Sequence, residues 1–386
     1  MDQRTIQILF ALLRSAISGT QLTQKEQDDY SPDMLGELIK VSIRHDVVHL
    51  LVLGLKQNKL IPKEQGDIEK YIYKAVARHE RTNYEYENLC AALEKGQIPF
   101  IPLKGSILRH YYPEAWMRTS CDIDVLVHNE DLNKAISYLS DNYGYVEKER
   151  ATHDVSLFSP AGIHVELHFD LVEEGRAKNA IGVLQSVWEN VTLRENSEYL
   201  YEMSDAYFYF YHIAHMAKHF ETGGCGIRPF VDLYILDGLK NKDLALRDKM
   251  LSDGGLLRFA EVCRKLSRIW LCGEEIDELS LQLQEFLFHG GLYGSFDNRV
   301  MLQQKKKGGR FGYLMSRVFA PYSRLKRYYP VLEKYPILTP VMQVRRWFML
   351  LRSDVFTMAK KELETNSNVD RKKAEQMNVF LDDIGL

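Results

Sequence analysis

Two aspartates spaced two residues apart are the first candidates for chemistry in this chain. Asp122 and Asp124 flank Ile123, at the start of a β-branched run that continues through Val125 to Val127. On a strand, residues i and i+2 project from the same face, about 6.5–7 Å apart. Neighbouring carboxylates repel unless a cation lies between them, and Mg²⁺ prefers carboxylate and phosphate oxygens. The spacing therefore predicts a site for one or two divalent ions, Mg²⁺ or Mn²⁺.

A later segment offers a third carboxylate. Its apolar residues alternate with ionisable ones, and the ionisable face carries His164, Glu166, His168 and Asp170. Such alternation predicts a half-buried strand, and either Glu166 or Asp170 could complete an acidic triad. Three carboxylates on adjacent strands suit two-metal phosphoryl chemistry. His168 could orient a carboxylate or touch substrate, and equally it could be an ordinary, partly buried histidine.

A tight turn upstream of the aspartates has the composition of an anion site. Gly105 lets the backbone approach a phosphate closely, and Ser106 stands where a helix begins. The N–H groups of a helix N-terminus, together with the Ser106 hydroxyl, can hold phosphate oxygens. Lys104 and Arg118 add positive charge nearby.

These motifs together resemble the signature of the nucleotidyltransferase superfamily, which has a polymerase beta-like fold. The sequence resembles the bacterial family of uncharacterised nucleotidyltransferases. That family has a Leu-Lys-Gly turn, an Arg shortly before an Asp-hydrophobic-Asp strand, and an acid-hydrophobic-His-aromatic motif. In this chain the three motifs are Leu103–Gly105, Arg118 with Asp122–Asp124, and Glu166–Phe169.

The resemblance implies a role for each of these residues. It implies that Asp122, Asp124 and Glu166 bind the metal and carry the catalysis, and it selects Glu166 over Asp170. It also implies that Gly105 and Ser106 hold the β- and γ-phosphates of a nucleotide, assisted by Lys104 and Arg118. The expected substrate is therefore a nucleoside triphosphate.

A weaker similarity continues into the C-terminal half, through Lys218 and Arg228. Both are candidates for substrate or supporting contacts, although Arg228 could equally pair with Asp232 four residues later. On the predicted helix that contains Lys218, the side chains of His212, His215 and His219 share one face. They could bind zinc, but a face packed on the catalytic domain, with Lys218 or a histidine near the nucleotide, is the favoured interpretation.

The surrounding pattern predicts a mixed α/β fold whose core is flanked by helical regions. Apolar residues recur at helical spacing in the N-terminal region, residues 1–93. A nucleotidyltransferase core with a mixed sheet is predicted over residues 94–200, including a strand near residues 98–103 and a hairpin over residues 155–171. Residues 201–386 form a C-terminal region predicted to be mostly helical.

The composition is that of an ordinary soluble protein. The net charge is −3, so there is no general attraction to nucleic acid. No apolar run approaches the roughly 20 residues that cross a bilayer, and the first residues do not read as a signal peptide. The five cysteines are scattered, which predicts reduced thiols in a cytoplasmic protein.

One region has a charge very different from the chain as a whole. Residues 299–352 contain 13 Lys or Arg and a single acid, Glu333, interleaved with aromatic residues. Such a stretch could bind nucleic acid or anionic lipid, or it could pack against the acidic remainder of the chain. Internal packing is the favoured prediction, so nucleic acid is a possible partner but not the expected one.

The combined prediction is a metal-dependent enzyme that transfers a nucleoside monophosphate from an NTP to an acceptor hydroxyl or phosphate. The acceptor is an unknown small molecule or protein. An AMP transferase that modifies proteins and a catalytically silent nucleotide-binding module are the alternatives.

Overall fold

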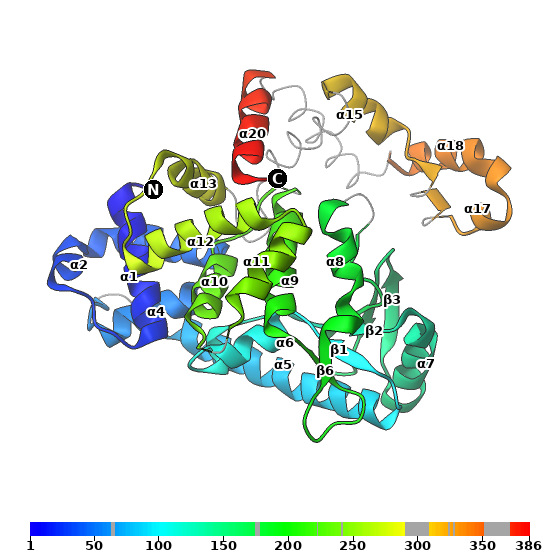
Figure 1. The fold of residues 1–386 in the computed structure, drawn as a ribbon, viewed down its shortest axis with the longest axis horizontal. Coiled ribbons are helices and arrows are strands. Elements are labelled where there is room, and N and C mark those ends of the chain that lie inside the picture. Colours follow the sequence, from blue (N-terminus) through cyan, green and yellow to red (C-terminus); the bar gives the residue numbers. More distant parts are fainter. Residues whose placement is uncertain are drawn as a thin grey trace. The chain divides into compact units, whose positions relative to one another are not determined.

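The computed structural model describes most of the chain. It covers residues 1–62, 66–173, 178–221, 223–240, 242–289, 309–322, 325–326, 329–350 and 371–386. These residues form two compact units, drawn in Figure 1. The first unit holds Met1–Lys218 and Gly226–Gln284, and the second holds His219–Cys225 and Glu285–Leu386. All the predicted site residues belong to the first unit.

The N-terminal region is helical, as predicted. Its helices are α1 (Gln3–Ser18), α2 (Gln24–Asp29), α3 (Leu35–Arg44), α4 (Val48–Gln57) and α5 (Lys70–Lys95). Helix α1 begins where the Asp2 side chain accepts a hydrogen bond from the Thr5 N–H at 2.8 Å, and it ends at Gly19 with φ 70°. An acidic N-cap and a left-handed glycine are the standard local reasons for a helix to start and stop at those residues.

Helices α1 and α4 pack closely because α4 carries a glycine at their contact. A Cβ added to Gly54 would lie 2.2 Å from the carbonyl oxygen of Leu12. No larger side chain fits at that distance, so this glycine allows the two backbones to approach.

The mixed sheet that was predicted for the core is present, with five strands in the order β1-β2-β5-β4-β3. Its strands are β1 (Phe100–Pro102), β2 (Asp122–Val127), β3 (Val146–Arg150), β4 (Asp154–Phe158) and β5 (His164–His168). Strand β2 pairs in parallel with β5, and the other neighbours pair antiparallel, including the predicted hairpin β4–β5. Helices α6 (Gly105–Leu108) and α7 (Leu132–Tyr143) connect the strands.

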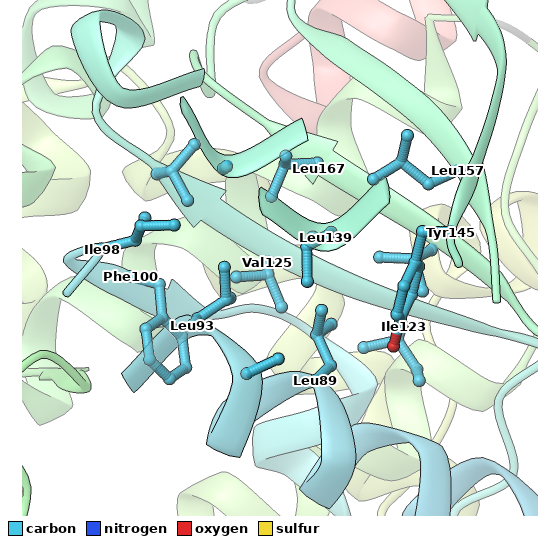
Figure 2. Packing of buried hydrophobic residues seen from close by; sticks show 14 of the residues in the cluster. Leu89, Leu93, Ile98, Phe100, Ile123, Val125, Leu139, Tyr145, Leu157 and Leu167 are labelled. Carbon is cyan, nitrogen blue, oxygen red and sulfur yellow. The ribbon is translucent and has the colours of Figure 1, made fainter. Parts of the chain in front are cut away.

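One face of this sheet is covered by α5 and α7. Figure 2 shows Ile123 and Val125 of β2 and Leu167 of β5 packed with Leu89 and Leu139 of the two helices. All five side chains are essentially inaccessible to solvent. Burying this apolar face fixes the register of the strands, because a shift of one residue would exchange the two faces. The opposite face therefore carries the ionisable residues.

The remainder of the first unit is mainly helical. A short helix α8 (Ile181–Gln185) and the two-stranded sheet β6 (Val191–Leu193) and β7 (Tyr201–Met203) follow the main sheet. The helices that follow are α9 (Asp205–Phe220), α10 (Arg228–Gly238), α11 (Leu244–Asp253), α12 (Leu257–Cys272) and α13 (Glu278–His289), of which α9 and α13 extend past the bounds of the first unit.

The described part of the second unit is also helical. It contains α15 (Gly309–Val318), α17 (Val331–Lys334), α18 (Thr339–Leu350) and α20 (Arg371–Ile384). The side chains of Ala320, Leu325 and Leu332 form a small apolar cluster in this unit. Among the helices described, none has the length and apolar character needed to cross a membrane. All five cysteines are free thiols, as expected.

Candidate active site

The polar face of β2 and β5 brings the predicted acids together. In the parallel register, Asp124 stands opposite Glu166 and Asp122 opposite His164. The apolar residues between them, such as Ile123 and Val165, are completely buried on the other face. Alternation along each strand therefore directs the carboxylates to the same side of the sheet.

The acids form two overlapping groups whose side chains could hold a cation. One group is Asp122, His164 and Glu166, and the other is Asp124, Glu166 and His168. Within each group, one potential ligand atom from every residue lies within 4.8 Å of the others. Glu166 belongs to both groups. Three carboxylates with two histidine nitrogens fit Mg²⁺ or Mn²⁺, because these ions take oxygen ligands and Mn²⁺ also accepts imidazole.

Asp170, the other candidate for the third acid, has a different contact. Its Oδ1 accepts a hydrogen bond from the backbone N–H of Val172 at 2.9 Å, just beyond the end of β5. Neither of the two groups found among the described residues includes Asp170. The geometry thus places Glu166, rather than Asp170, beside the two aspartates.

The charges in this site are strongly coupled. Lys104 Nζ lies 2.8 Å from Asp124 Oδ1, and His168 Nε2 lies 3.1 Å from the same oxygen. Burial alone would raise the pKa of Asp124, but Lys104 and His168 outweigh it and hold the pKa well below its usual range. Burial, reinforced by the neighbouring charge of Asp124, instead raises the pKa of Asp122. The two aspartates therefore differ in their affinity for protons.

Lys104 reaches the acids from a strained position in the backbone. Its φ of 45° and ψ of −117° are values that glycine adopts readily and lysine rarely does. A strained residue of this kind costs about 1–3 kcal/mol and persists where its surroundings impose it. The preceding residue, Leu103, donates its N–H to the carbonyl of Asp124 at 2.9 Å. The turn is thus tied directly to the strand that carries the aspartates.

The predicted phosphate turn follows at the start of α6. A Cβ added to Gly105 would lie 3.2 Å from Ser120 Cβ and 3.8 Å from Arg118 Nη1, so this position is narrow. The Ser106 side chain is buried, and its hydroxyl has no hydrogen-bond partner among the described residues. Its role in holding phosphate stays a prediction.

Arg118 is buried in an ion pair that the sequence did not predict. Its Nε donates to Asp232 Oδ1 at 2.7 Å, and its Nη1 donates to the carbonyl of Thr119 at 2.7 Å. Tyr112 donates to the same carboxylate oxygen, also at 2.7 Å. Burial alone would raise the pKa of Asp232, but Arg118 outweighs it and lowers the pKa. Arg118 is therefore beside Gly105 but already engaged with α10.

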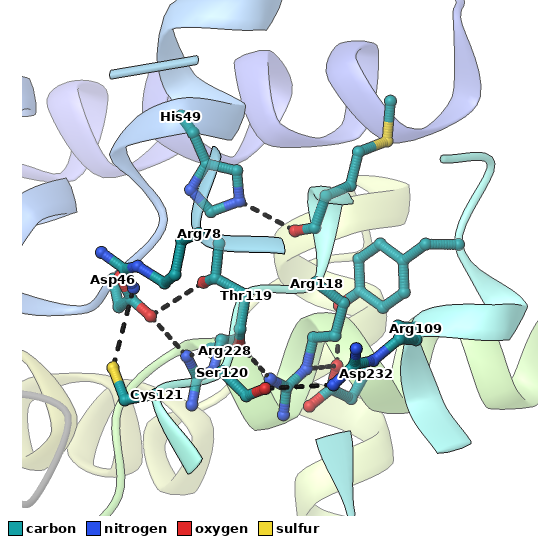
Figure 3. Close-up of polar contacts among 12 residues, drawn as sticks. Asp46, His49, Arg78, Arg109, Arg118, Thr119, Ser120, Cys121, Arg228 and Asp232 are labelled. Carbon is teal, nitrogen blue, oxygen red and sulfur yellow. Dashed lines mark hydrogen bonds and ion pairs between the residues drawn. The ribbon is translucent and has the colours of Figure 1, made fainter. Parts of the chain in front are cut away.

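Arg228 takes part in a second polar cluster, around Asp46. Figure 3 shows the side chains of Arg228 and Thr119 directed at the Asp46 carboxylate, with Arg78 on its other side. Arg228 Nη1 lies 2.5 Å from Asp46 Oδ2, and Arg78 Nη1 lies 3.2 Å from Oδ1. The charge of Arg228 also acts on Asp122, where burial and the charge of Asp124 raise the pKa and Arg228, together with Lys104, opposes them. Arg228 thus links the N-terminal helices to the rim of the acidic site instead of pairing with Asp232.

A pocket adjoins the acidic site on the side of α9. It is lined by Lys104 and His168 from the site and by Tyr211, His215 and Lys218 from α9. Lys218 pairs with Glu173, which also contacts His153 Nε2 at 3.0 Å. The structure therefore brings Lys218 close to the predicted site.

The histidines of α9 lie in different environments. His212 Nε2 lies 3.1 Å from the carbonyl oxygen of Pro229, while His215 lines the pocket. Neither of the two groups of potential cation ligands among the described residues includes His212, His215 or His219. The sequence did not predict that the pocket would be lined by Tyr211, His153 and Glu173. The aromatic-rich sequence of α9 was the only signal for Tyr211.

Comparison with known families agrees with this geometry. The family model described as "Uncharacterised nucleotidyltransferase" matches residues 32–271, which is more than half of the chain and includes every residue of the site. The chain belongs to this family, and its class is therefore that of a nucleotidyltransferase. No curated protein and no solved structure matched the chain.

Proposed function

We propose that this protein is a metal-dependent nucleotidyltransferase that moves a nucleoside monophosphate from an NTP to an acceptor hydroxyl or phosphate. Asp122, Asp124 and Glu166 would hold Mg²⁺ or Mn²⁺. The observation that supports the proposal is that Glu166 belongs to both groups of potential cation ligands on adjacent strands. Two-metal enzymes of phosphoryl transfer place two ions about 3.5–4 Å apart, with shared carboxylates between them.

In the proposed reaction, an oxygen of the acceptor forms a bond to the α-phosphorus of the NTP. The bond from that phosphorus to the bridging oxygen breaks, and pyrophosphate leaves. Bound divalent ions supply charge stabilisation for the phosphate oxygens. Where the acceptor is a hydroxyl, Glu166 takes its proton.

The other residues of the chain bind and orient the substrates. Gly105 and Ser106 hold the β- and γ-phosphates, and Lys104 adds a positive charge at the same turn. His168 keeps the Asp124 carboxylate in place through its 3.1 Å contact. The α9 pocket, with Tyr211 and Lys218, holds part of the nucleotide or the acceptor next to the acids.

Isothermal titration with each of the four NTPs, with and without Mg²⁺ or Mn²⁺, tests the metal site. We expect nucleotide binding that depends on the ion, and we expect Asp122→Asn with Asp124→Asn to abolish that dependence. The matched pair Glu166→Gln and Asp170→Asn separates the two candidate third acids, because only the first should weaken ion-dependent binding. Unchanged ion-dependent binding in the double aspartate variant would refute the assignment of the metal site.

Release of pyrophosphate separates an enzyme from a silent binding module. Incubation with α-labelled NTP, cell extract and Mg²⁺ should produce pyrophosphate and transfer the label to an acceptor. Retention of the label by macromolecules would identify a protein acceptor, whereas a labelled small product would identify a metabolite. Binding without any pyrophosphate release in either case would contradict the proposed turnover.

A further inference from the structure

We propose that Lys104 is an exchangeable internal cation. Its ammonium group neutralises Asp124 and Glu166 when no divalent ion is bound, and it moves to the triphosphate when ion and nucleotide enter together. This inference rests on the proposed function, since it assumes that the ion binds to these carboxylates.

The first argument is that the ammonium group and the ion need the same oxygens. Lys104 Nζ lies 2.8 Å from Asp124 Oδ1 and 4.0 Å from Glu166 Oε2. Mg²⁺ binds carboxylate oxygens at about 2.1 Å, so an ion on Asp124 Oδ1 would lie no more than about 5 Å from the ammonium nitrogen. Two cations at that separation in a buried site repel strongly. The ion can bind tightly only if Lys104 leaves.

The second argument is that Lys104 has somewhere to go. It immediately precedes Gly105 and Ser106, the turn proposed to hold the phosphates, and it also lines the α9 pocket. A lysine side chain has four flexible carbons, so its ammonium group can change partners while the backbone stays in place. The N–H of Leu103, bonded to the carbonyl of Asp124, keeps the turn next to the acids during this exchange.

The third argument comes from the arrangement of His168. Its Nε2 lies 3.1 Å from Asp124 Oδ1 and 3.4 Å from Glu166 Oε2, the same two oxygens that face Lys104. The histidine thus bridges the pair from another direction and can hold both carboxylates in position after Lys104 has moved. The acids then remain ready for the ion.

The exchange has a consequence for binding order. An ion alone must displace Lys104 from Asp124 without giving it a new partner, whereas an ion that arrives with a nucleotide also supplies phosphate oxygens. Ion and nucleotide should therefore strengthen one another's binding, and by linkage the effect is the same in both directions.

The test is the affinity for Mn²⁺, measured by electron paramagnetic resonance of the free ion, with and without the non-hydrolysable analogue α,β-methylene-ATP. Lys104→Met removes the charge and keeps an unbranched side chain that is one atom shorter. We expect it to tighten Mn²⁺ binding without nucleotide by at least about tenfold, because a competing positive charge is gone. In the same variant, the analogue should strengthen Mn²⁺ binding much less than it does in the wild type.

The matched control is Lys134→Met, on α7, whose ammonium group contacts only the carbonyl of Gln97 among the described hydrogen bonds. It should leave both Mn²⁺ affinities at the wild-type value. If Lys104→Met binds Mn²⁺ no more tightly than the wild type, while Asp124→Asn abolishes binding, the exchange is refuted and the metal site stands. If Asp124→Asn leaves Mn²⁺ binding intact, both the exchange and the proposed metal site are refuted.

Discussion

Removing the carboxylate that holds Arg118 should destabilise the first unit strongly. Asp232 is completely buried and accepts hydrogen bonds from both Arg118 and Tyr112 at one oxygen. Asp232→Asn removes the negative charge and takes from the buried guanidinium group of Arg118 its ion-pair partner among the described residues. The loss of one partner from a buried ion pair costs about 3–5 kcal/mol, and we expect a fall of that size in the free energy of unfolding.

The assay is urea unfolding followed by tryptophan fluorescence. The chain has four tryptophans, and a Trp347→Phe background leaves only Trp116, Trp188 and Trp270, which all lie in the first unit. Arg118→Met should also destabilise this unit. The double variant should lose less than the sum of the two single losses by about 1–3 kcal/mol, since neither charge is then left alone.

The result also distinguishes two roles of Arg118. A residue used only to bind nucleotide would leave stability unchanged when replaced, whereas a residue that closes a buried ion pair would not. If the free energy of unfolding of Asp232→Asn lies within about 1 kcal/mol of that of the background protein, the ion pair is not a major source of stability and the argument from burial is refuted.

Two further predictions concern the N-terminal helices. Burial lowers the pKa of both His45 and His49 to about 4, below the unfolded value near 6.5, so the unfolded chain binds more protons between those pH values. Stability should therefore fall as the pH drops from 6.5 to 4, by up to about 3 kcal/mol for each histidine, and urea titrations should show a flatter pH profile for His45→Gln with His49→Gln. Gly54→Ala should lower the free energy of unfolding by more than about 2 kcal/mol, because the added Cβ would collide with Leu12. The control is Gly36→Ala, whose added Cβ would have no atom within 4 Å and should leave the stability unchanged or raise it in the same urea assay. Equal effects of the two substitutions would contradict the close packing of α1 and α4.

Local patterns were enough to predict the part of the fold that carries the acids. The β-branched run Ile123–Val127 and the alternation from His164 onward each specify a strand and its buried face, and the structure has β2 and β5 there. The three-residue strand β1 is shorter than the apolar run Ile98–Leu103 and begins only after Pro99, which has no N–H to donate to a neighbouring strand.

Other features had no local signal. Strand β3 reads Val-Glu-Lys-Glu-Arg and is exposed along its whole length, so it lacks the alternation that marks a half-buried strand. The partners of Arg118 and Arg228 are 114 and 182 residues away in the sequence, and such pairs depend on how distant helices pack. The structure places the predicted acids close together, whereas the counter-ions of Arg118 and Arg228 could not be predicted from local patterns.

Eight of the 13 basic side chains in residues 299–352 lie outside the described side chains, and the expected acidic partners of this stretch stay a prediction. Within the second unit, Arg346 donates to the carbonyls of Arg317 and Val318. Arg345 lies over the ring of Tyr329, 5.7 Å from its centroid. These contacts show that backbone carbonyls and an aromatic ring accommodate arginines in this region.

The open edge of the sheet affects how the protein behaves at high concentration. At the other edge, Phe100 of β1 donates its N–H to the carbonyl of Tyr199 at 2.9 Å, so that edge is covered by the chain itself. Strand β3 is the exposed edge, and unpaired edges invite strands of other molecules to add to the sheet. Its consecutive charges from Glu147 to Arg150, and a shift of register between Glu147 and Glu149, make such pairing unfavourable. The strand with the weakest sequence signal is thus the one that protects the sheet from aggregation.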